Sequence, residues 1–143
     1  PELSSDFTIG RGTVVRDGRD VTIVACGVEV ARAIQAADRL ADRGLAARVV
    51  AMSTVKPIDR ELLAICAAET GCLVVAEDHN VHGGLGGAVA EAVAATNPVP
   101  IEFVGVLDTF GESGEPDELA TKYRIDAAAI VAAAVKVHAR NPR

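Results

Sequence analysis

The sequence predicts an α/β fold, specifically a three-layer α/β/α sandwich around a five-stranded sheet that is mostly parallel and has one antiparallel strand. Apolar runs of strand length alternate with helix-like segments, and helices placed in this way connect parallel strands through right-handed crossovers. Half of the 143 residues are hydrophobic, but only 3% are aromatic and none is Trp. A core of Ala, Val, Leu and Ile suits helices packed closely on a sheet. This length suits one domain that buries roughly 70% of its unfolded surface.

Five apolar runs are expected to form the strands: residues 13–16, 20–25, 47–52, 72–76 and 101–104. The first two are joined by Asp17-Gly18, a hairpin-turn signal, so the first strand is expected to run antiparallel to the second. The fourth run is apolar throughout, as expected of a strand covered on both faces.

Five segments are expected to form the helices: residues 28–43, 60–69, 85–95, 116–122 and 127–139. Asp59 and Asp126 are suitable N-caps for the second and the last of these. Gly44 and Gly71 supply left-handed stops after the first and the second. The expected organisation is a linker over residues 1–12, one domain over 13–139 and a tail over 140–143.

Composition argues against several classes of protein. The net charge of −6 is the opposite of a nucleic-acid footprint. Cys26, Cys66 and Cys72 form no CxxC pair, so neither a disulfide framework nor a zinc site is expected, and a reducing cytoplasm fits. No apolar run reaches membrane-spanning length. Because the chain opens without Met, its numbering is expected to begin inside a longer sequence.

The segment EDHNVHGGLGGAVAEAV, residues 77–93, places acids, histidines and glycines in front of a predicted helix. A helix N-terminus can bind phosphate, but the dinucleotide fingerprint needs a glycine at position 89, which is Val89. The P-loop pattern is absent, and no Lys or Arg lies between Arg60 and Lys122. A phosphate at this turn would therefore depend on backbone groups alone.

Two other chemistries are possible at the same turn. A metal could bind Glu77, Asp78, His79 and His82, but consecutive residues of an extended chain point to opposite faces. A histidine beside carboxylates could instead serve in proton transfer or bind an anion. The plainer interpretation is that the acids cap the turn and solvate the strand end, while the histidines are surface or interface residues.

Nucleophilic catalysis has little support elsewhere in the chain. No G-x-S-x-G elbow is present. Ser113 precedes a predicted helix and is more typical of an N-terminal turn than of a catalytic triad. Cys26 ends a predicted strand and is interpreted as an inert, buried thiol.

Five stretches, in this order, resemble the C-terminal domain of the transketolase family. They are DVTIVACG (20–27), STVKPID (53–59), VVAEDHNVHGGLGGAVAE (74–91), DTFGESG (108–114) and ELATKYRIDAAAIV (118–131). The chain is most similar to the C-terminal subunit of split transketolases, and the resemblance extends from Phe7 to about Val137. The order and spacing of the five stretches together are more specific than any single stretch.

The resemblance implies a three-layer sandwich that forms part of a larger enzyme. In this family, thiamine diphosphate and a divalent metal such as Mg²⁺ support the transfer of a two-carbon ketol unit between sugar phosphates. They bind between two other domains, at a dimer interface. The family's Gly-Asp-Gly metal motif has no counterpart here beyond Arg16-Asp17-Gly18, so no catalytic, cofactor-binding or metal-binding residue is assigned, and the chain alone is expected to be inactive.

The role that remains is assembly with the family's N-terminal and pyrimidine-binding domains, within a homodimer of the complete enzyme. Glycines allow backbones to approach closely, and Phe110 could anchor a second docking loop. The expected docking residues are Glu77, Asp78, His79, His82, Gly83, Gly84, Gly86, Phe110, Gly111 and Ser113. Two alternatives remain: an anion-sensing regulatory module, and the equivalent domain of a deoxyxylulose-phosphate synthase or of a 2-oxo-acid dehydrogenase beta subunit.

Overall fold

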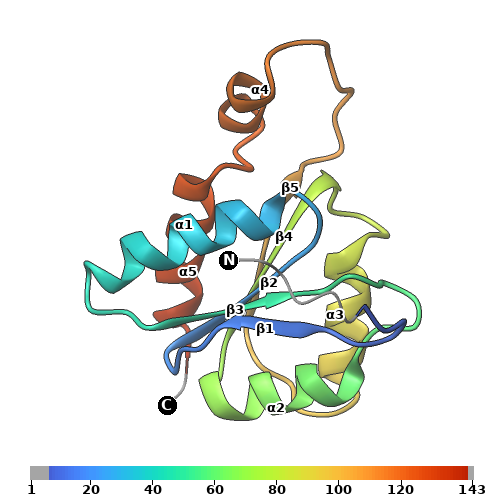
Figure 1. The fold of residues 1–143 in the computed structure, drawn as a ribbon, viewed down its shortest axis with the longest axis vertical. Coiled ribbons are helices and arrows are strands. Elements are labelled where there is room, and N and C mark those ends of the chain that lie inside the picture. The colour runs from blue at the N-terminus through green and yellow to red at the C-terminus, as the bar shows by residue number, and fades with distance from the viewer. Residues whose placement is uncertain (1–6, 142–143) are drawn as a thin grey trace.

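The structure is a computed structural model of the chain, and it describes residues 7–141. The strands are β1 (Thr13–Arg16), β2 (Val21–Ala25), β3 (Ala47–Ala51), β4 (Leu73–Asn80) and β5 (Ile101–Val106). The helices are α1 (Glu29–Ala41), α2 (Arg60–Thr70), α3 (Leu85–Ala94), α4 (Pro116–Lys122) and α5 (Ala127–His138). The fold is the predicted α/β sandwich with a five-stranded mixed sheet (Figure 1).

The strand order is β1-β3-β2-β4-β5, and within residues 7–141 only β1 runs antiparallel to its neighbour. The antiparallel strand was expected, but the predicted hairpin with β2 is wrong, because β3 lies between the two strands. The backbone N–H groups of Arg19 and Asp20 both donate to Ala46 O, at 3.0 Å. Gly18 packs directly against the backbone at Ala47, where a Cβ atom would clash. The segment that contains Asp17-Gly18 therefore crosses the start of β3 and does not form a hairpin.

Two apolar layers form, one on each face of the sheet. Ile23 and Val49 belong to the layer covered by α1 and α5, whereas Val24 and Val50 belong to the layer covered by α2 and α3. This alternation follows from the period of two along a strand. Figure 1 shows α1 and α5 together on one side of the sheet and α2 and α3 on the other.

The predicted helix ends are largely confirmed. The Asp59 carboxylate accepts the Leu62 N–H at 3.0 Å, and the Asp126 carboxylate accepts the Ala129 N–H at 2.9 Å. Gly71 is the left-handed C-cap of α2. The main differences lie in β4 and β5, which continue beyond their apolar runs to Asn80 and Val106.

Residues 107–124, here called the arm, project from the sandwich beyond the end of β5 (Figure 1). The arm contains α4, whose Ala120 is buried and belongs to the same apolar layer as Ile23. The arm is tied to β4 by a hydrogen bond of 2.8 Å from Asn80 Nδ2 to Asp108 Oδ1. No helix within residues 7–141 has the length and apolar character needed to cross a membrane.

Candidate docking site

Glu77 organises the glycine-rich turn from inside the protein. Its side chain is fully buried, and its carboxylate accepts the Leu85 N–H at 2.7 Å and the Gly86 N–H at 3.0 Å. A carboxylate in this position satisfies free N–H groups at the start of α3 and complements the helix dipole. The expectation that Glu77 contacts a partner at the surface is therefore wrong. A phosphate at these two N–H groups would have to displace the protein's own carboxylate.

Two of the glycines are needed for packing within the chain. A Cβ atom on Gly84 would overlap the Glu77 carboxylate, and one on Gly86 would lie 2.6 Å from Phe103 Cδ1. Both glycines therefore serve internal contacts. Gly86 is buried, which corrects its assignment to a partner's backbone, whereas Gly84 is half-buried and its contact with a partner stays a prediction. Gly83 and Gly87 have open space in front of them, and Gly83 has a positive φ of 78°. Close approach of a partner backbone to Gly83 and Gly87 stays a prediction.

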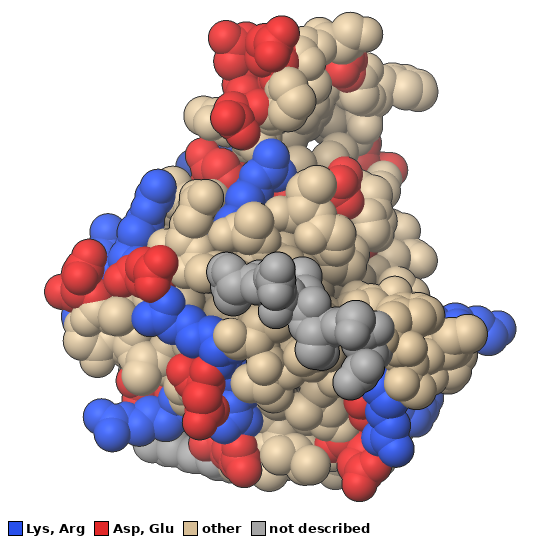
Figure 2. All heavy atoms as spheres, in the orientation of Figure 1, with Lys and Arg blue, Asp and Glu red and all other residues tan. Residues whose placement is uncertain are grey.

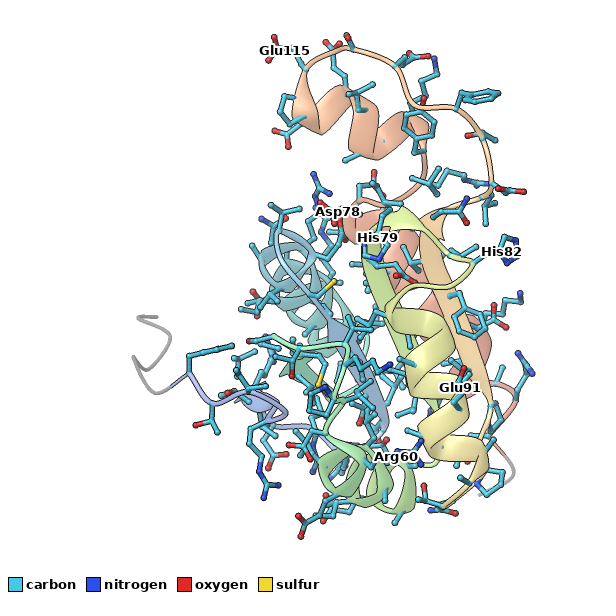
Figure 3. All side chains as sticks on the ribbon, turned by 90° about the vertical axis from the view of Figure 1, so that its right-hand side faces the viewer. Arg60, Asp78, His79, His82, Glu91 and Glu115 are labelled. Atoms are coloured by element: carbon cyan, nitrogen blue, oxygen red, sulfur yellow. The ribbon has the colours of Figure 1, made fainter. Side chains whose placement is uncertain are left out.

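The two histidines of the turn do not converge. His79 Nε2 lies 2.5 Å from Glu77 Oε2, and His79 Nδ1 lies 3.5 Å from Asp78 Oδ1. The His82 side chain is exposed and points away from His79 (Figure 3). Among the described residues, no group of three or more histidine, cysteine, aspartate or glutamate side chains could hold a metal ion. Asp78, His79 and His82 remain candidates for contact with a partner.

The second expected docking loop lies on the arm. Phe110 is 99% exposed, and Gly111 and Ser113 beside it are also exposed. The Tyr123 hydroxyl donates a hydrogen bond of 3.1 Å to the Phe110 carbonyl, which fixes the backbone that presents the ring. Phe110 on the arm therefore remains a candidate for contact with a partner.

A crevice between the carboxyl ends of β2 and β4 is the ligand position expected for an open α/β sheet, because the connections from these strands lead to opposite faces. Burial raises the pKa of the Cys26 thiol there to about 11, and the carboxylates of Asp78, Glu77 and Glu29 add to this. A thiol that stays protonated at neutral pH is a poor nucleophile. The raised pKa supports the interpretation of Cys26 as inert, but the residue is half-buried and not buried as expected.

Glu29, the first residue of α1 after β2, is a buried polar residue that the sequence did not single out. Burial raises its pKa, a hydrogen bond from Arg32 opposes the shift, and the charges of Asp78 and Asp126 add to it. Its Oε2 has no hydrogen-bond partner, and among the buried side-chain polar atoms of residues 7–141 it is alone in this. These conditions favour the neutral carboxylic acid.

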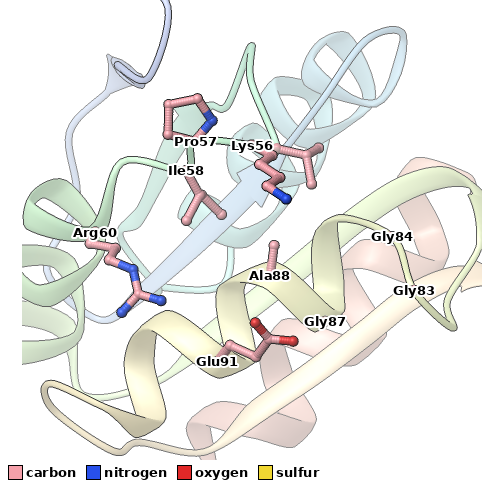
Figure 4. A pocket seen from close by; sticks show the side chains of 10 residues that line it. Lys56, Pro57, Ile58, Arg60, Gly83, Gly84, Gly87, Ala88 and Glu91 are labelled. Carbon is pink, nitrogen blue, oxygen red and sulfur yellow. The ribbon is translucent and has the colours of Figure 1, made fainter.

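A groove of about 460 Å³ lies between residues 55–60 and the first half of α3. Lys56 and Arg60 extend from one wall, and Gly83, Gly87 and Glu91 belong to the other (Figure 4). Sequence reasoning missed these two cations because they are far from the turn along the chain. The sequence contained no direct signal for them, since their position depends on α2 and α3 lying on the same face of the sheet.

The five-stranded mixed sheet, its two helical layers and the projecting arm define the class of this domain as an α/β sandwich. Residues 10–130 match the family model described as Transketolase, C-terminal domain, and the chain therefore belongs to this family. It is 45% identical over 137 residues to the 6-deoxy-6-sulfo-D-fructose transketolase subunit of Clostridium sp. (strain MSTE9), covering 96% of this chain and 42% of that protein.

Two further proteins place the likeness among split enzymes. The chain is 38% identical over 121 residues to one subunit of the apulose-4-phosphate transketolase of Phocaeicola vulgatus, covering 85% of this chain and 38% of that protein. It is also similar to a solved split-gene transketolase described as an inactive beta4 tetramer. That likeness has a TM-score of 0.94 and 50% identity, and it covers 99% of this chain and 47% of the other. The chain thus spans less than half the length of these relatives.

Proposed function

We propose that this chain is the C-terminal domain of a thiamine-diphosphate-dependent transketolase-type enzyme, that the chemistry takes place on the remaining domains, and that the role of this chain is to dock with them. The observation that carries the proposal is topological. Because β1 is antiparallel, its first residue Thr13 pairs with Ala51 at the end of β3. The chain therefore begins its sandwich at the edge where the parallel strands have their carboxyl ends. A preceding domain would be tethered at this carboxyl edge.

The backbone before β1 is held at the same edge. Gly10 N donates to Thr54 Oγ1 and Gly12 N donates to Asp59 Oδ2, both at 3.0 Å. Thr54 and Asp59 belong to the segment that follows β3. These bonds fix where the chain reaches the sandwich, and so they limit which surface a preceding domain can cover.

Exposed apolar side chains gather at this edge as well. Val28 follows β2, Val55 follows β3, and Leu107 and Phe110 follow β5, and all four are exposed. Apolar side chains exposed in neighbouring loops are typical of a surface that another domain covers. This arrangement supports docking through the carboxyl edge.

The described residues do not fit the coenzyme. The N–H groups of Leu85 and Gly86 are occupied by Glu77, and no acidic or histidine cluster among residues 7–141 could hold a metal ion. Burial raises the pKa of the Cys26 thiol to about 11, which disfavours the reactive thiolate at neutral pH. The proposal therefore assigns no catalytic residue to this chain. It specifies ketol transfer as the class of reaction and not the sugar, because the two named relatives differ in theirs.

Reconstitution tests the proposal. The chain would be mixed with the pyrimidine-binding half and the diphosphate-binding subunit, supplied as separate polypeptides, and ketol transfer would be measured. We expect no transfer by the chain alone, no calorimetric heat with thiamine diphosphate, and activity only when all parts are present. Saturable one-to-one binding of the coenzyme by the isolated chain would overturn the proposal. The sequence preceding Pro1 would separate a transketolase from a deoxyxylulose-phosphate synthase or a 2-oxo-acid dehydrogenase.

A further inference from the structure

The groove beside α3 carries positive charge that the chain does not neutralise. Neither Lys56 nor Arg60 forms an ion pair within residues 7–141, and Glu91 offsets only one of the two charges. Gly87 and Ala88 leave the opposite wall nearly free of side chains, so another backbone can approach the helix closely. Ile58 adds apolar surface to the lining. The groove therefore suits a segment that combines an apolar side chain with acidic groups.

The arm of the same chain has this chemistry. At the apolar end of the arm, the Phe110 side chain is 99% exposed. Glu115, Asp117 and Glu118 are exposed acids that form no ion pair within the described part of the chain, whereas Glu112 is paired with Lys122 at 2.5 Å. Figure 2 shows this acidic surface gathered at the outer end of the projecting arm.

The arm cannot fill the groove of its own molecule. Figure 3 shows Glu115 at one extremity of the protein, whereas Arg60 and Glu91 lie toward the opposite end. Tyr123 and Asn80 fix the base of the arm through hydrogen bonds to Phe110 and Asp108. A complementary contact between arm and groove must therefore join two molecules.

We propose that the arm of one copy docks in the groove of a second copy, and that the second copy's arm docks reciprocally in the groove of the first. Phe110 lies against Ile58 and Ala88, while Glu115 and Glu118 face the two cations of the groove. Such a reciprocal contact forms about a two-fold axis and closes on itself, so it gives a dimer and not a filament. The inference rests on the docking role proposed above for the arm, and it names the partner of that loop.

Charge reversal provides the test, with the 143-residue chain alone. One variant reverses the groove (Lys56→Glu/Arg60→Glu), and the other reverses the arm (Glu115→Lys/Glu118→Lys). We expect the wild type to dimerise in sedimentation equilibrium, and each variant alone to dimerise at least ~10-fold more weakly, because both of its contacts become repulsive. Mixing the two variants should restore the dimer, since the acidic arm then meets a basic groove and the basic arm meets an acidic groove.

Two further variants complete the design. Phe110→Ala should weaken dimerisation by about 10-fold or more without changing its dependence on salt, because it removes apolar burial only. As a matched control, Arg19→Glu/Arg43→Glu reverses two exposed charges at the opposite edge of the sheet and should leave dimerisation unchanged. Circular dichroism would confirm that every variant is folded.

Several results would overturn the inference. They are a wild type that stays monomeric at all accessible concentrations, variants that dimerise as well as the wild type, and a mixture that fails to restore the dimer. A groove variant that loses reconstitution with the other domains, while the wild-type chain remains monomeric, would assign the groove to a preceding domain instead. Because the sedimentation assay contains only this chain, its outcome is separate from that of the coenzyme and reconstitution experiments.

Discussion

Replacing Glu77 by Gln removes one negative charge from the centre of the turn while keeping the shape of the side chain. The carboxylate accepts two backbone N–H groups at the start of α3 and also contacts His79. An amide has only one acceptor oxygen, so its NH₂ group must face Leu85 N–H, Gly86 N–H or the histidine. Glu77→Gln therefore leaves at least one buried donor without a partner.

The magnitude follows from the bonds that are lost. A buried hydrogen bond to a charged group contributes about 1.5–3 kcal/mol, and a charge at a helix N-terminus contributes about 0.3–1 kcal/mol. We expect Glu77→Gln to lower the free energy of unfolding by about 3 kcal/mol, or the midpoint temperature by roughly 10 °C for a domain of this size. Native domains have about 5–15 kcal/mol of stability, so the variant should remain folded in water.

Urea unfolding followed by circular dichroism would measure this change. Glu91→Gln is a matched control, because it is the same substitution at an exposed position of α3 and should change stability by less than about 0.5 kcal/mol. If the unfolding curves of the Glu77 and Glu91 variants coincide, the buried carboxylate does not stabilise the turn and the reasoning is wrong.

Three further predictions concern neighbouring residues. Gly84→Ala should destabilise the fold by about 1–3 kcal/mol because its Cβ would overlap the Glu77 carboxylate. Gly87→Ala faces open space in α3 and should instead stabilise the fold by about 0.5–1 kcal/mol in the same unfolding assay. The Cys26 thiol, whose pKa is raised to about 11, should be alkylated slowly at pH 7 and faster as the pH approaches 11. Mass spectrometry of the labelled peptide would measure this rate, and rapid labelling at neutral pH would contradict the prediction. Burial raises the pKa of Glu29 above 4.5 in the folded state, so folding favours its protonated form. Stability should therefore fall as the pH rises from about 4.5 through the folded-state pKa, and a Glu29→Gln variant that shows the same fall would refute this assignment.

The sequence predicted features that depend on neighbouring residues. The caps at Asp59 and Asp126 need only a side chain three residues away from the N–H it accepts, and both were confirmed. The end of β4 was harder, because Glu77 reads as a solvated acid unless the path of the chain back to Leu85 is known. Its burial is a tertiary effect, since two helix N–H groups and a histidine together satisfy the charge.

The groove at Lys56 and Arg60 depends on information that no local pattern contains. Chain connections run from β2 to β3 in one direction across the sheet and then from β3 past β2 to β4 in the other. Because each crossover is right-handed, this reversal moves α2 to the face opposite α1, and the next step to β5 leaves α3 on the same face as α2. The two walls of the groove therefore follow from the strand order, and the strand order depended on rejecting the hairpin suggested by Asp17-Gly18. With β3 placed between β1 and β2, right-handed crossovers alone put the segment after β3 and the start of α3 on one face of the sheet. The nearness of Lys56 to Gly83 then follows from the strand order, without knowledge of the side chains.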